Sequence, residues 1–323
     1  MRLVVCIPFL FLLSGCGTPS LLITPVSNTY ELQQVDVKAG KGLTASSKVA
    51  IIAVEGTLMD VREGGLLRGE ENPLSLFVQE LDEAASDDSV KAVVLRVNSP
   101  GGSVTCSDVM YDAVLRFKQQ THKPVVASAQ EVVASGAYYV SCAADRIVVN
   151  PTSVVGSIGV IFETFDLVGT MDKLGVRSEA IKSAELKDMG SPFKHMTAHE
   201  REVMQGMVDE YYARFKSVVS SNRPLKDPAM FPTITDGRVF SGARAVELGL
   251  ADQTGRLQDA IEIARQMASA PKASVIMYKR PFGYSGSIYA DASTPEPKSN
   301  EMSLKLPLSE PMFPTGFYYL WQP

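Results

Sequence analysis

Five short segments of this chain are rich in β-branched residues and almost continuously apolar, as parallel strands buried on both faces of a sheet are. They lie at residues 48–55, 90–98, 124–128, 146–150 and 157–162. Between them, residues 74–86, 104–120 and 135–144 show the hydrophobic spacing of helices. Strands that alternate with helices in this order predict an α/β layered domain.

A long helix is expected later in the chain, because Thr197 and Glu200 form a capping-box pattern. Its apolar stripe predicts core packing or a contact between subunits. The stripe consists of Val203, Met204, Met207, Val208, Tyr211, Tyr212, Phe215 and Val219. Helices at 241–248 and 257–267 and a strand at 274–278 should follow. The aromatic segment 317–321 is expected to dock on the body or on a neighbouring subunit.

The N-terminal residues have the pattern of an export signal. Residues 3–13 form an apolar run that is too short to span a bilayer as a helix, and it ends in Leu13-Ser14-Gly15-Cys16. This ending resembles the bacterial lipobox, in which the cysteine carries lipid such as palmitate. We therefore expect a lipoprotein signal peptide at 1–15, lipidation of Cys16, a flexible tether at 16–47, a folded domain at 48–283 and a tail at 284–323. Inner-membrane and outer-membrane sorting both stay open.

Charge and cysteine usage limit the partners. The net charge is −5 and no Lys/Arg cluster stands out, so a nucleic-acid partner is not expected. With Cys16 carrying lipid, Cys106 and Cys142 remain in the expected folded domain. In an oxidising compartment they either pair or are two small buried residues.

Two turns of small residues carry the chemistry. Residues 98–102 (Asn-Ser-Pro-Gly-Gly) and 134–138 (Ala-Ser-Gly-Ala-Tyr) are each expected to end a strand and open a helix. Gly102 would present a bare backbone N–H, and Ser135 would place a hydroxyl at a helix N-terminus. Taken singly, the first segment is a tight turn and Ser135 a helix cap. Together they suggest a nucleophile beside oxyanion donors, the core of an acyl-transfer site.

Histidine chemistry is a weak candidate for this site. The histidines are His122, His195 and His199, and no Gly-x-Ser-x-Gly elbow occurs, so a Ser-His-Asp triad is disfavoured although the sequence leaves it open. His195, His199 and Glu200 lack the spacing of a zinc helix. We expect no metal and no cofactor.

A lysine is the remaining candidate base, since a lysine can deprotonate serine where burial disfavours its charged form. Lys182, Lys187 and Lys194 lie in one segment, and the residues alone rank them nearly equal.

Ordered motifs over roughly residues 48 to 280 resemble the signal peptide peptidase A family of Ser-Lys serine proteases. They are residues 98–102, 134–139 (ASGAYY), 156–160 (GSIGV), 186–197 (LKDMGSPFKHMT) and 254–260 (TGRLQDA). The resemblance implies the Clp-protease/crotonase fold with a largely parallel sheet. It also implies homo-oligomeric rings of four to eight subunits, whose active sites need neighbouring subunits. Many relatives have a membrane-spanning N-terminal anchor, whereas lipid is expected here.

By this resemblance Ser135 is the nucleophile and Lys187 the general base. Ser157 would hold the lysine amine, and the N–H groups of Gly102 and Gly136 would form the oxyanion hole. An apolar setting around Ser157 agrees with that role.

The expected function is a membrane-tethered serine endopeptidase on the periplasmic side of the bacterial envelope, cutting hydrophobic peptides such as spent signal peptides or membrane-protein fragments. The substrate should lie as a strand along the edge near Val132 and Val133. A crotonase-like acyl-CoA enzyme and a non-catalytic scaffold lipoprotein are the alternatives. Subunit number, cleavage preference and the role of the tail stay open.

Overall fold

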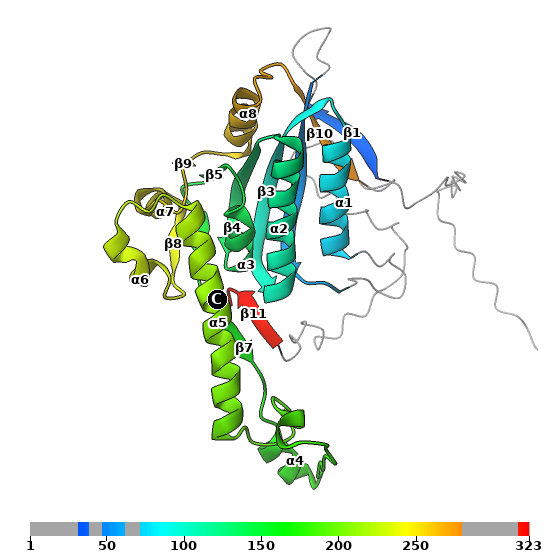
Figure 1. Cartoon of the computed structure of the whole chain (residues 1–323), viewed down its shortest axis with the longest axis vertical. Coiled ribbons are helices and arrows are strands. Elements are labelled where there is room, and N and C mark those ends of the chain that lie inside the picture. The colour runs from blue at the N-terminus through cyan, green and yellow to red at the C-terminus, as the bar shows by residue number, and fades with distance from the viewer. Residues whose placement is uncertain (1–31, 39–46, 62–71, 280–315, 323) are drawn as a thin grey trace, which may run out of the picture.

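The structure is a computed structural model that describes residues 32–38, 47–61, 72–279 and 316–322 (Figure 1). The expected signal peptide at 1–15 and the lipidation site Cys16 lie outside the described residues. None of the helices in the described part of the chain combines the length and apolar character that crossing a bilayer requires.

A mixed, largely parallel sheet forms the body and confirms the predicted α/β class. Its central order is β1-β10-β2-β3-β4-β5-β9, with parallel pairing from β10 to β9 and β1 antiparallel at one edge. The strands are β1 (Gln33–Lys38), β2 (Lys48–Leu58), β3 (Val90–Ser103), β4 (Val125–Ala134), β5 (Arg146–Val149), β9 (Gln253–Thr254) and β10 (Ser274–Lys279). Part of the expected tether is thus strand β1.

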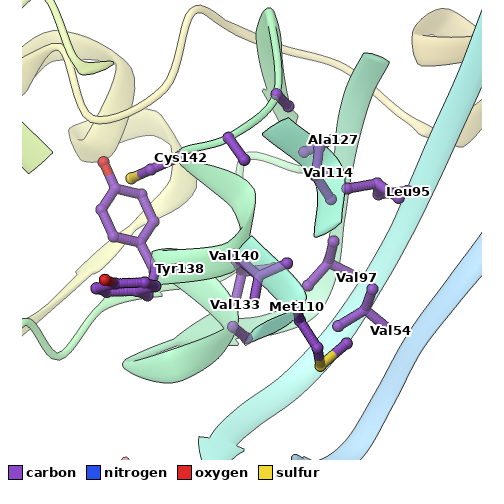
Figure 2. Packing of buried hydrophobic residues seen from close by; sticks show 14 of the residues in the cluster. Val54, Leu95, Val97, Met110, Val114, Ala127, Val133, Tyr138, Val140 and Cys142 are labelled. Atoms are coloured by element: carbon purple, nitrogen blue, oxygen red, sulfur yellow. The ribbon is translucent and has the colours of Figure 1, made fainter. Parts of the chain in front are cut away.

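Helices cover both faces of this sheet, which explains the continuous apolar runs. On one face lie α1 (Pro73–Ser86), α2 (Val104–Thr121) and α3 (Gly136–Ser141); on the other lies α8 (Leu257–Met267). Along β2, Ala50 and Ile52 pack into the first cluster while Val49 and Ile51 pack into the second. Figure 2 shows part of the first cluster, where side chains from α2, α3 and strands β2–β4 meet.

Three predicted boundaries are wrong around the expected turns. Residues 98–103 continue β3, because Gly101 and Gly102 pair with the end of β2 on one side and with a C-terminal strand on the other. The strand predicted at 157–162 is not continuous: residues 157–160 form a connection between β6 (Val154–Gly156) and β7 (Ile161–Glu163), and Ser157 has a positive φ of 50° at its start. The helix expected at 135–144 is shorter than predicted, since α3 spans only Gly136–Ser141.

A small subsheet adjoins the end of β4. There β6 pairs parallel with β4 and antiparallel with β8 (Val239–Ser241). Ser241 caps the following helix α7 (Gly242–Leu248) with a hydrogen bond to the Arg244 N–H. The preceding segment contains η2 (Pro228–Met230) and α6 (Phe231–Ile234).

Residues 164–210, here called the arm, extend away from the sheet (Figure 1). They contain α4 (Val168–Leu174), η1 (Glu185–Asp188) and the first half of α5 (Ala198–Asn222). The predicted capping box of Thr197 and Glu200 is confirmed. Of the predicted stripe, Phe215 and Val219 are buried, whereas the members within the arm stay half-exposed.

The C-terminal aromatic segment docks on the body as β11 (Gly316–Leu320), which confirms one of its two expected positions. It lies between β3 and β7 and pairs antiparallel with both.

Candidate active site

Ser135 lies where β4 ends and α3 begins, and it is 1% exposed. Its φ and ψ of 53° and −118° lie outside the regions that serine normally occupies, so the surrounding structure holds it in a strained conformation. Its N–H donates to the Gly156 carbonyl and its own carbonyl accepts from the Tyr139 N–H. The hydroxyl makes no capping hydrogen bond. Ser135 therefore occupies the N-cap position without acting as a side-chain cap.

Ser157 lies next to Ser135 because it follows β6, the strand that pairs with the end of β4. Ala134 pairs with Gly156 in the β4–β6 ladder, so the two serines follow a matched pair of residues. Ser157 is 7% exposed, and its N–H is held by the Arg238 carbonyl at 2.8 Å. The structure thus brings Ser135 and Ser157 together.

Gly101, Gly102 and Gly136 lie near Ser135 at positions where neighbouring atoms leave no space for a side chain. A Cβ on Gly101, where φ is +98°, would lie 2.6 Å from the Gly136 nitrogen. A Cβ on Gly102 would lie 2.0 Å from the Leu58 carbonyl oxygen. The sequence motifs predicted roles for Gly102 and Gly136 but none for Gly101 or Leu58, whose contribution depends on strand pairing.

Strand β11 runs past these glycines as an extended peptide. Tyr319 pairs with Gly102 and Leu320 with Gly101, and the Trp321 N–H donates to the Pro100 carbonyl at 2.8 Å. The Tyr319 carbonyl oxygen would lie 2.0 Å from a Cβ on Gly101 and 3.1 Å from one on Gly136. A peptide carbonyl oxygen therefore lies beside Gly101 and Gly136, the latter next to Ser135 in the sequence.

The edge predicted for the substrate is wrong. Val132 and Val133 pair with Val154 and Val155 of β6, and Val133 also pairs with Ser99 of β3. Both sides of that segment are occupied within the sheet. The extended segment that lies beside Gly101 and Gly102 is β11, which pairs with β3 and β7.

A model of Peptidase family S49 matches residues 117–270 of this chain. A Methanocaldococcus jannaschii protein named "Putative protease MJ0651" is 34% identical over 278 residues, which cover 85% of each chain. An Enterococcus faecium protein named "Putative signal peptide peptidase SppA" is 34% identical over 235 residues, 73% of this chain and 68% of the relative. This chain belongs to peptidase family S49.

The S49 peptidase is therefore a serine endopeptidase with the Clp-protease/crotonase fold, as the motifs predicted. "Protease 4" of Haemophilus influenzae is 32% identical over 225 residues, which cover 69% of this chain and 35% of that relative.

The three candidate lysines of the S49 peptidase differ in their surroundings. Lys194 donates to Asp188 at 2.6 Å and to the buried Glu200, and the hydrogen bond to Asp188 followed by that to Glu200 raises the pKa of Lys194. Lys182 donates to Asp188 and to the Glu185 carbonyl, each at 2.8 Å. The two carboxylate partners favour the charged form of the Lys194 amine.

Lys187 is exposed, and within the described residues its amine has no hydrogen bond or ion pair. Its neighbour Asp188 is tied through Lys194 to Glu200 in the first turn of α5. Glu200 lies about 16 Å along that helix from Tyr211, which is next to β11. Within one chain, the structure therefore does not bring Lys187 to Ser135.

The histidines lie elsewhere in the S49 peptidase. His122 ends α2, at the opposite end of that helix from Ser103 and Gly102. His195 bonds Asp166 at 2.6 Å in the arm, with both side chains exposed. In the described ranges no three His, Cys, Asp or Glu side chains cluster as metal ligands.

Cys106 and Cys142 are free and buried. Burial is the main cause that raises the pKa of each thiol to about 12. The interpretation as two separate buried residues is the correct one here.

Proposed function

We propose that this serine endopeptidase is tethered to the membrane on the periplasmic side and cuts hydrophobic peptides with a Ser135–Lys187 dyad. The observation that carries the proposal is strand β11, whose Tyr319 carbonyl oxygen lies against Gly101 and Gly136. A substrate bound in this way would offer its carbonyl carbon to the Ser135 hydroxyl.

In the proposed reaction, Ser135 Oγ attacks the peptide carbonyl while the Lys187 amine accepts its proton. The N–H groups of Gly102 and Gly136 hold the oxyanion, each lowering the barrier by about 3 kcal/mol. Lys187 then protonates the leaving amine, and water resolves the acyl-enzyme. Ser157 directs the lysine amine through one hydrogen bond, a role that its position beside Ser135 supports.

We further propose that Lys187 acts on Ser135 of a neighbouring subunit in a homo-oligomeric ring. Three observations support this. Lys187 is exposed and distant from Ser135 of its own chain, whereas Lys182 and Lys194 already have acidic partners. The arm also carries exposed large apolar side chains that a second subunit would cover. They are Phe165, Leu167, Leu174, Val176, Ile181 and Phe193.

Location follows from the lipobox-like segment that ends at Cys16, with lipid as the anchor. An exported, tethered peptidase meets envelope peptides, and the aromatic surroundings of β11 favour hydrophobic ones. Remnant signal peptides and membrane-protein fragments have that chemistry.

A complementation experiment tests the dyad and its arrangement together. Ser135→Ala and Lys187→Met should each abolish cleavage of a hydrophobic peptide. Co-assembled in equal amounts, they should regain about a quarter of wild-type activity, since each site then draws its two residues from two chains independently. Lys182→Met is the matched control and should stay active.

Two results would count against the proposal. Full activity of Ser135→Ala would exclude Ser135 as the nucleophile. Inactivity of both single variants with no recovery on mixing would exclude sites shared between subunits.

A further inference from the structure

Strand β11 marks a side-chain pocket as well as a backbone path, and the role of that pocket rests on the proposed function. The Tyr319 carbonyl lies where the glycines meet beside Ser135, so Tyr319 stands in for the residue on the acyl side of the cleaved bond. Its side chain is 0% exposed. The groups around that ring are therefore the ones that a substrate side chain would contact.

Two aromatic rings form the walls of this pocket. Tyr139 of α3 stacks on Tyr319 with centroids 5.2 Å apart and planes at 25°, and Phe215 of α5 lies at 4.8 Å and 52°. Tyr139 and Phe215 also contact each other edge to face at 5.1 Å. This aromatic pocket, here called the slot, stabilises an aromatic ring beyond its burial alone, through one stacked and one tilted ring contact.

The far end of the slot is polar. The Tyr319 hydroxyl donates to the Tyr211 backbone carbonyl at 2.8 Å. Burial is the main cause that raises the pKa of Tyr319, so this hydroxyl remains a neutral donor. A phenylalanine ring would fill the slot without that hydrogen bond.

Asp108 of α2 connects the two walls. Its Oδ1 accepts from the Tyr139 hydroxyl at 2.6 Å. The same carboxylate accepts three hydrogen bonds of 2.7–3.0 Å from Arg214, the residue before Phe215. Asp108 thus holds the Tyr139 ring directly and, through Arg214, contacts the part of α5 that carries Phe215.

We propose that this slot is the specificity pocket and selects an aromatic residue, tyrosine above phenylalanine, on the acyl side of the cleaved bond. Asp108 is a positioning residue that holds the Tyr139 ring in place against the bound ring.

The test compares peptides that differ only at this position, with Tyr, Phe, Leu or Ala, cut by the full-length chain. Ratios of kcat/KM between peptides are compared, because competition from β11 lowers every kcat/KM by the same factor and cancels in the ratio. We expect Tyr to exceed Phe by roughly fivefold, as one hydrogen bond allows, and Ala by more than roughly tenfold.

Variants assign the preference to the pocket. Phe215→Ala and Asp108→Ala should lower the Tyr-to-Ala ratio while the Ala peptide is still cut, whereas a merely structural defect would lower both rates alike. Phe162→Ala is the matched control, since Phe162 contacts Phe317, two residues before Tyr319. It should leave the ratio unchanged.

The outcomes separate this inference from the proposed function. Cleavage of all four peptides at similar kcat/KM, or an unchanged ratio in both Phe215→Ala and Asp108→Ala, overturns the pocket and leaves the peptidase intact. If neither the full chain nor its Tyr319→Ala variant cuts any peptide, both the proposed function and this inference fail.

Discussion

Truncating Tyr319 should open the groove that β11 fills. The Tyr319 ring is fully buried between Tyr139 and Phe215, and its hydroxyl bonds the Tyr211 carbonyl. Replacing a buried aromatic ring by alanine costs about 3–5 kcal/mol. Because β11 is a short terminal strand, this cost weakens its docking more than the rest of the fold. At about 1.36 kcal/mol for each factor of ten, the population with an open groove should rise roughly 150- to 5,000-fold, until the groove is always open.

Hydrogen exchange and peptide cleavage measure this change together. In Tyr319→Ala, the amides of residues 317–321 should exchange faster, and cleavage of an added peptide should accelerate. Gln322→Ala is the control, because its hydrogen bond to Glu163 is exposed and the loss of that bond should change little. Unchanged exchange at 317–321, or faster exchange without faster cleavage, would refute the idea that β11 and substrate share one groove.

Three further outcomes are expected. Gly101→Ala should lower kcat by about 100-fold or more, because its Cβ would lie 2.0 Å from the carbonyl oxygen of the bound strand, whereas Gly206→Ala, with open space around it, should stay fully active. Hydrogen bonds from two lysines lower the pKa of Asp188 to about 2, so its contribution to arm stability is present above pH 4 and lost as pH falls through 2. Amide exchange in the arm should therefore accelerate at low pH, and Asp188→Asn should abolish this pH dependence. Cys106 and Cys142 should resist iodoacetamide at pH 8 in the native protein and react after unfolding, and rapid native labelling would contradict their burial.

Local patterns were enough to predict the elements that depend on local chemistry. The helix expected at 257–267 is α8, and the capping box at Thr197 stands as predicted, because spacing and capping act within a few residues. The parallel sheet followed from the alternation of strands and helices. The nearness of Ser135 and Ser157 needed the resemblance as well, since 22 positions separate them in the sequence.

Long-range pairing explains the errors. Whether residues 98–103 turn or stay extended depends on β11, which lies more than 200 positions further along the chain. The apolar run 157–162 gives no sign that Ser157 has a positive φ or that strand structure resumes only at Ile161. The residues alone ranked three lysines equally, because ion pairs with Asp188 and Glu200 are tertiary contacts.

Strand β11 and the arm differ in how far their apolar side chains are removed from water. In β11, Tyr318, Tyr319 and Leu320 are buried between β3 and β7 of the same chain. In the arm, by contrast, Ile181 is completely exposed and Leu174 is 73% exposed. Apolar surface gains about 25 cal/mol for each Å² that is covered, so a second copy that covered the arm would stabilise it. We therefore expect assembly to be driven by the arm and to deliver Lys187 to Ser135 as its consequence.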